Sequence, residues 1–196
     1  MRVAYATAEA CGQGHAVRGV ALVRAARRAG IELRAFGPPK PEVAGGYEGS
    51  IDWRDQLVAF APELLLADVG WSALSGLRAE LGIPGWILLR WTPAASLRIP
   101  GIERWERRIS IEPAADARPQ ITDRIEPVVV DVPYFRPADG AELRAGYNTW
   151  WEATLFGYRD RVRWIAEPAI LDRAERIRVG GEMTRNGADV LMGMLA

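Results

Sequence analysis

The residue best suited to chemistry in this 196-residue sequence is its one histidine, His15. It follows a Gly12-Gln13-Gly14 turn between an apolar run at Arg2–Ala8 and a helical pattern that begins at His15. Glycines let a backbone approach a ligand closely, and a helix start supplies free N–H groups. Because an imidazole titrates near neutral pH, His15 is suited to polarise or deprotonate a hydroxyl group. The alternative is a structural role, in which His15 bonds a nearby backbone group.

Two other interpretations of the glycine turn fit less well. A dinucleotide-binding fingerprint needs a third glycine where this sequence has Val17, and an acidic residue where it has Phe36-Gly37. That argues against a small reductase. A P-loop needs Gly-Lys-Ser/Thr, which this sequence lacks. The turn is therefore interpreted as a ligand loop that leads into a candidate general base.

Asp68 is the second candidate, because it follows an apolar run, Leu64-Leu65-Leu66-Ala67. A run without alternation is typical of a strand buried on both faces of a parallel sheet, here expected over Glu63–Val69. Ligands bind beyond the carboxyl ends of such strands. Asp68 is therefore predicted to be a supporting carboxylate for an acceptor hydroxyl or for His15. A loop cap is the alternative.

The spacing of apolar residues predicts the elements that position these side chains. Strands are expected over Arg2–Ala8, Ile31–Phe36, Glu63–Val69 and Trp86–Trp91, and helices over His15–Ala29, Ile51–Phe60 and Ser72–Leu81. This alternation predicts an α/β fold with a doubly wound, mostly parallel, Rossmann-like sheet. Further strands are expected at Arg107–Glu112 and Pro127–Val132, and helices at Ala141–Phe156, Asp172–Arg178 and Asn186–Leu195.

Composition narrows the expected partners and location. The 25 basic and 25 acidic residues give zero net charge, which argues against nucleic acid as a partner. The lone Cys11 forms no internal disulfide, the first residues do not resemble a signal peptide, and no apolar stretch approaches the ~20 residues that span a bilayer. A cytoplasmic protein is expected, with at most peripheral membrane contact through exposed tryptophans. No Asp-x-Asp pair or His/Cys cluster suggests a metal.

Three segments resemble the acceptor-side domain of GT-B glycosyltransferases. GQGHAVRGVALVRAARRAG, at Gly12–Gly30, is similar to the family's Gly-x-Gly-His loop and the helix that follows it. PELLLADVGWSALSGLRAELGIP, at Pro62–Pro84, is similar to a later strand–helix unit, and RISIEP, at Arg108–Pro113, resembles the passage out of that domain. The resemblance, which includes bacterial N-acetylglucosaminyltransferase-like members, implies an acceptor-side domain over residues 1–110 and a shortened donor-side portion over 111–196.

A fourth segment, AGYNTWWEATLFG at Ala145–Gly157, resembles the family's donor-site helix. In that family the amides at the helix start face the diphosphate of a nucleotide sugar, and a glutamate bonds the ribose hydroxyls. A glycine-led helix start does suit phosphate, and a carboxylate accepts hydrogen bonds from a diol. The resemblance assigns these roles to Gly146, Tyr147, Asn148, Thr149 and Glu152. Alternatively, Asn148 is an N-cap and Glu152 lies on a solvated turn.

The resemblance implies an inverting transfer of a sugar from a nucleotide donor, such as a UDP-sugar, to an acceptor hydroxyl. His15 would be the base on its Gly12-Gln13-Gly14 acceptor loop, Asp68 would support it, and no metal or resident cofactor is expected.

The donor side departs from the family pattern. Only about a dozen residues separate Pro133 from Ala145, whereas one βαβ unit takes about thirty. The family's proline after the donor-helix glycine is replaced by Tyr158. A second hypothesis is therefore a catalytically degenerate binding or accessory protein. It would form a homodimer or pair with a chain that supplies the missing half, with Trp150 and Trp151 at the interface.

Overall fold

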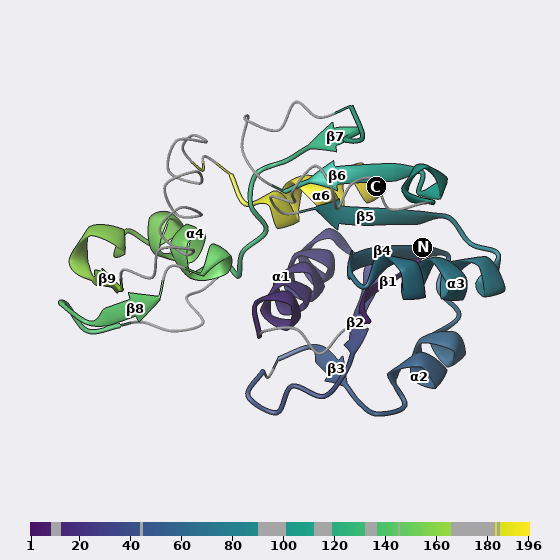
Figure 1. Cartoon of the computed structure of the whole chain (residues 1–196), viewed down its shortest axis with the longest axis horizontal. Helices are drawn as coiled ribbons and strands as arrows, with labels where there is room; N and C mark the ends of the chain where they lie inside the picture. The colour runs from purple at the N-terminus through teal and green to yellow at the C-terminus, as the bar shows by residue number, and fades with distance from the viewer. Residues whose placement is uncertain are drawn as a thin grey trace.

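The computed structural model describes residues 1–8, 13–43, 45–89, 101–111, 119–131, 137–144, 146–165, 183 and 185–196. Its centre is a seven-stranded sheet in which all neighbouring strands are parallel (Figure 1). In spatial order the strands are β3 (Tyr47–Gly49), β2 (Glu32–Gly37), β1 (Arg2–Thr7), β4 (Leu64–Val69), β5 (Gly85–Leu89), β6 (Arg107–Ser110) and β7 (Asp123–Arg124). The predicted α/β fold with a Rossmann-like parallel sheet is confirmed.

Helices cover both faces of the sheet, so its central strands are buried on both sides. One face carries α1 (Gln13–Ala29) and α6 (Gly187–Leu195), and the other carries α2 (Trp53–Phe60) and α3 (Trp71–Leu81) (Figure 1). In β4, Leu64 and Leu66 pack in the α1-side core, whereas Leu65 and Ala67 pack in the α2–α3 core. This alternation follows from the two-residue period of a strand and explains the continuous apolar run in the sequence.

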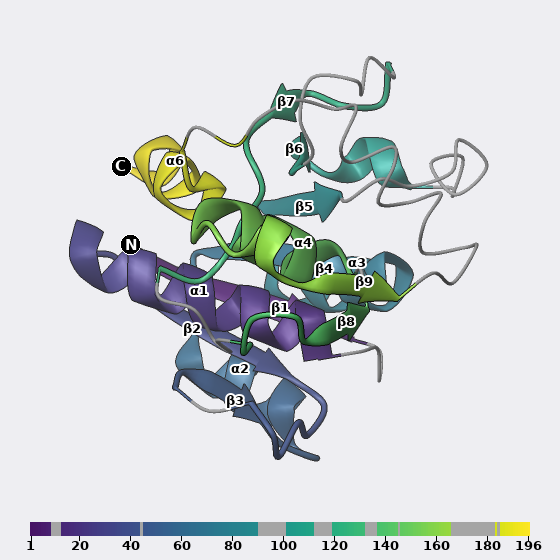
Figure 2. The same cartoon turned by 90° about the vertical axis from the view of Figure 1, so that its left-hand side faces the viewer.

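A smaller unit lies over the α1 face (Figures 1 and 2). It consists of β8 (Glu142–Arg144), α4 (Tyr147–Leu155), the 3-10 turn η3 (Arg159–Arg161) and β9 (Arg163–Ile165), and its two strands pair in parallel. Trp150 and Trp151 of α4 are only 8% and 1% exposed and belong to the α1-side core. The expectation that these two tryptophans form an intermolecular interface is therefore wrong, because they bury the small unit against its own chain.

Two expected elements take another form, and side-chain hydrogen bonds explain the first. Residues 127–131 are not a strand: the Asn186 amide donates to the Val129 carbonyl at 2.7 Å and accepts from its N–H at 3.3 Å. These bonds replace those of a strand ladder, and Asn186 also caps α6. The expected helix at Ala141–Phe156 begins only after Gly146, because residues 142–144 pair with β9 instead.

Other differences are smaller. The edge strand β3 lies between β2 and α2, where the sequence predicted no strand, and Gly70 is the N-cap of α3. A 3-10 turn, η2 (Ile102–Arg104), precedes β6. The expected helix at Asp172–Arg178 lies outside the described residues. In the part of the chain that the structure describes, no helix combines the length and apolar character needed to cross a bilayer.

Candidate functional site

The two predicted catalytic residues, His15 and Asp68, meet at the point where the sheet reverses its winding. From β1 the chain builds outward to β2 and β3 and then returns to add β4 on the other side of β1. The connections that leave the carboxyl ends of β1 and β4 therefore lead to opposite faces of the sheet, and open α/β sheets bind ligands at such a point. Asp68 follows Leu66 by two residues in β4, so its side chain faces α1. His15 lies in the first turn of α1, which begins at Gln13.

The contact between the two side chains is a buried hydrogen bond. His15 Nδ1 lies 2.8 Å from Asp68 Oδ2, and the two residues are 5% and 4% exposed. An ionised carboxylate only accepts hydrogen bonds, so this geometry assigns the proton to Nδ1. The lone pair of the neutral imidazole then lies on Nε2, for which the described residues provide no hydrogen-bond donor. A histidine oriented in this way by a carboxylate is suited to accept a proton.

Asp68 carries its charge because three donors converge on it. Burial alone would raise the pKa of its carboxyl group, but the Arg18 charge and the hydrogen bonds from His15 and Tyr5 outweigh burial and hold the pKa well below its usual range. The Tyr5 hydroxyl lies 2.5 Å from Asp68 Oδ2 and 2.7 Å from the His15 carbonyl oxygen. Burial, and then the Asp68 charge, raise the pKa of Tyr5 well above its usual value, so Tyr5 stays a neutral donor.

Arg18 completes the buried cluster and was missed in the sequence. Its Nη1 donates to Asp68 Oδ2 at 2.5 Å, and its residue is 1% exposed. The available signal was an arginine one helical turn after His15, inside the otherwise apolar stretch Ala16–Val23. Tyr5 was missed as well, because a tyrosine in an apolar strand is read as core and its hydroxyl carries no pattern. The cluster is hereafter Tyr5, His15, Arg18 and Asp68.

The predicted donor-site helix begins beside this cluster. The Asn148 amide nitrogen donates to the Gly14 carbonyl at 2.5 Å, and the Asn148 amide oxygen accepts from Arg18 Nη2 at 3.2 Å. The first turn of α4 therefore contacts the first turn of α1, although the two helices are more than a hundred residues apart in sequence. Sequence reasoning placed Asn148 and His15 in one site without showing this contact.

The other predicted donor-binding residues take different positions. Gly146 is the N-cap of α4 with an extended backbone, and among the described residues no side chain caps the helix start. Thr149 is half-buried in the first turn. Glu152 is buried, and its hydrogen bond with the Tyr158 hydroxyl contributes, after burial and the Glu152 charge, to raising the pKa of Tyr158. The structure therefore brings Asn148 to the cluster and turns Glu152 towards Tyr158.

The acceptor loop is described in part. Gln13 is exposed and Gly14 half-buried, and both belong to the first turn of α1, not to a turn before it. Gly12 lies outside the described residues, and so does the side chain of Tyr147. Among the described residues, no group of three or more histidine, cysteine, aspartate or glutamate side chains is arranged to hold a metal ion.

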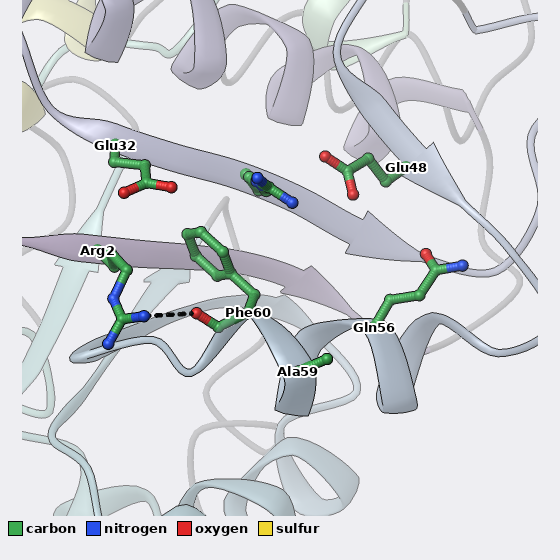
Figure 3. A pocket seen from close by; sticks show the side chains of 7 residues that line it. Arg2, Glu32, Glu48, Gln56, Ala59 and Phe60 are labelled. Carbon is green, nitrogen blue, oxygen red and sulfur yellow. Dashed lines mark hydrogen bonds between the residues drawn. The ribbon is translucent and has the colours of Figure 1, made fainter.

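A surface pocket elsewhere in the molecule is a poorer candidate for the functional site (Figure 3). It lies between α2 and the strands β1, β2 and β3, and includes Arg2 and Glu32 from the amino ends of two strands. Its lining is charged and solvated: Arg2 Nη1 donates to the Phe60 carbonyl at 3.3 Å, and the Arg34 guanidinium stacks on the Phe60 ring. It contains none of the predicted site residues.

No protein-family model matches the sequence, and no curated protein is significantly similar to it.

Proposed function

We propose that this protein is a glycosyltransferase that moves a sugar from a nucleotide-sugar donor, such as a UDP-sugar, to an acceptor hydroxyl with inversion. The observation that carries the proposal is the buried His15–Asp68 pair at the switch point of the sheet, with the start of α4 against it. A general base beside a helix start that no described side chain caps suits a reaction that removes a proton and releases an anionic phosphate.

The proposed reaction assigns one role to each group. His15 Nε2 accepts the proton of the acceptor hydroxyl while the acceptor oxygen bonds to the anomeric carbon of the sugar. The bond between that carbon and the diphosphate oxygen breaks, and the nucleoside diphosphate leaves with the bonding electrons. Asp68 stabilises the imidazolium that forms, and the amides of Gly146–Thr149 stabilise the charge on the leaving group.

The first test is ligand binding and turnover. We expect UDP or a UDP-sugar to raise the thermal stability of the protein, because a ligand that binds only the folded state stabilises it by mass action. His15→Ala should bind UDP as the unmodified protein does and release at least about a hundredfold less UDP from a UDP-sugar in the presence of acceptor sugars or lipids. A folded protein that responds to none of the common nucleotides or nucleotide sugars would end the proposal.

A second test concerns the assignment of Glu152 to the donor site. Glu152→Gln should weaken UDP binding if Glu152 turns from Tyr158 to a ribose, whereas Glu142→Gln, an exposed change in β8, should leave binding unaltered. Unchanged UDP affinity in Glu152→Gln would remove that residue from the donor site.

One observation favours a degenerate binding or accessory protein as the second candidate. Apart from β7 and α6, the described donor-side portion is a single β8–α4–β9 unit, and Glu152 of that unit is buried. Under this hypothesis the protein gains nucleotide-sugar binding only with a second copy or with a chain that supplies the missing half. Sedimentation and UDP binding measured over a range of protein concentrations would distinguish it from a self-sufficient enzyme.

A further inference from the structure

The Arg18 guanidinium divides its two terminal nitrogens between two partners on different elements. Nη1 donates to Asp68 Oδ2 on β4, and Nη2 donates to Asn148 Oδ1 on α4. Arginine and a carboxylate usually pair through two parallel bonds. Here the second carboxylate oxygen, Asp68 Oδ1, is buried without a hydrogen-bond partner in the described part of the chain. The second arm of Arg18 is therefore held on Asn148 and away from the Asp68 oxygen that could receive it.

Arg18 and His15 compete for the same oxygen. Asp68 Oδ2 lies 2.5 Å from Arg18 Nη1 and 2.8 Å from His15 Nδ1, and these two nitrogens are 3.4 Å apart. A protonated His15 would stand directly beside a permanent positive charge, at a distance where repulsion in a buried site is strong. The remaining described groups bonded within the cluster are the neutral Tyr5 hydroxyl on β1 and the uncharged Asn148 amide on α4.

We infer that Arg18 is a positioning residue that sets the proton affinity of His15. Asn148 maintains that proton affinity because it binds Arg18 Nη2 and keeps this nitrogen away from Asp68 Oδ1. Arg18 offsets part of the Asp68 charge, which leaves less of that charge to stabilise a proton on His15. Because Asn148 binds the second guanidinium nitrogen, Arg18 neutralises only part of the Asp68 charge, and the remaining charge still attracts the imidazolium. The inference rests on the proposed role of His15 as a base.

The test uses the fact that His15 is the only histidine in the chain. Its imidazole NMR signals therefore report one titration without assignment, in the full-length protein and without any substrate. Replacing Arg18 with the uncharged methionine should move the titration midpoint of His15 upward by about one pH unit, a tenfold gain in proton affinity. Arg18→Lys retains the charge and should keep the midpoint within a few tenths of a pH unit of the original.

A charge-neutral variant tests the part assigned to Asn148. Asn148→Ala removes the bond between Arg18 Nη2 and Asn148 Oδ1 and so allows Arg18 to turn towards Asp68 Oδ1, and we expect the titration midpoint of His15 to fall by about half a pH unit. This variant removes a half-buried amide, with its bonds to Arg18 and to the Gly14 carbonyl, and changes no charge, so it decides the question even where Arg18→Met does not fold. Arg24→Met, on the same helix but paired with Asp131 at the surface, is the matched control and should not change the midpoint.

The outcomes separate this inference from the proposed function. A midpoint unmoved in folded Arg18→Met or in Asn148→Ala, or an equal shift in Arg24→Met, would overturn the inference. If the midpoints move as expected but no nucleotide binds, the positioning role stands and glycosyl transfer fails. If transfer is observed, its rate against pH should move with the His15 midpoint in each variant.

Discussion

At the scale of single residues, the buried charges determine what this site can do. Asp68 has lost nearly all contact with water and keeps its charge because Arg18, His15 and Tyr5 all contact it. A buried carboxylate held in this way orients the imidazole and leaves its far nitrogen available. The same arrangement makes the cluster vulnerable, because the loss of one member leaves another charge buried without a partner.

Replacing Asp68 with asparagine should therefore destabilise the protein by about 3–5 kcal/mol at pH 7, since Arg18 would be left without its carboxylate. The pKa of Asp68 is lowered by folding, so its stabilising contribution is complete above the unfolded value near pH 4 and is lost as the pH falls below it. Chemical denaturation between pH 7 and pH 3 should show that the difference in unfolding free energy between the unmodified protein and Asp68→Asn becomes smaller on acidification. Asp160→Asn, on an exposed carboxylate, should alter neither stability nor its pH dependence. A difference in unfolding free energy that stays constant from pH 7 to pH 3 would contradict the charged state assigned to Asp68.

At the scale of elements, the close approach of α1 to β1 positions the cluster. Gly19 lies one turn after His15, directly over the Tyr5 ring, and has no side chain to hold the two elements apart. This contact brings the first turn of α1 down onto the carboxyl ends of β1 and β4. The helix therefore delivers His15 and Arg18 to Asp68 from one side, and its glycine is part of the site's architecture.

Substituting Gly19 with alanine should disturb this approach. A Cβ at that position would lie 2.9 Å from the Tyr5 ring and 3.0 Å from the Ala35 Cβ, so α1 must move. We expect a loss of about 1–3 kcal/mol in unfolding free energy and a changed His15 NMR signal. Gly76→Ala in α3, where an added Cβ would meet no described atom outside the local helix backbone within 4 Å, should instead stabilise by about 0.5–1 kcal/mol. Equal effects of the two substitutions would show that α1 is not closely packed against β1.

At the scale of the whole molecule, the small β8–α4–β9 unit and the large sheet share one core. The α4 tryptophans pack with side chains of α1 and α6 on the same face of the sheet. A two-stranded sheet has little stability of its own. The small unit is therefore expected to fold together with the large sheet, and to keep the start of α4 beside His15.

A single unfolding transition should follow from this shared core. In Trp151→Ala, the loss of a 1%-exposed indole should reduce the unfolding free energy by about 3–5 kcal/mol, and fluorescence and far-UV circular dichroism should still report the same midpoint. Trp164→Ala, at a half-buried position in the same unit, should cost less. Two separate transitions would mean that the small unit folds independently of the sheet.

The sequence by itself determined the alternation of helices and strands in the first ninety residues, because apolar spacing and chain breaks are local properties. It also identified His15 and Asp68 as candidates, since a glycine turn and a buried strand each mark the carboxyl edge of a parallel sheet. It did not reveal β3 or β8, because such short strands depend on the backbone that pairs with them.

Only the tertiary structure decided which side chains share the site. Tyr5, Arg18 and Asn148 come from three elements and carry no common spacing, yet their polar atoms converge within hydrogen-bond distance of His15, Asp68 or each other. The structure also turned Trp150 and Trp151 inward. Burial and long-range hydrogen bonds are properties of the packed chain, so a pattern along the sequence cannot express them.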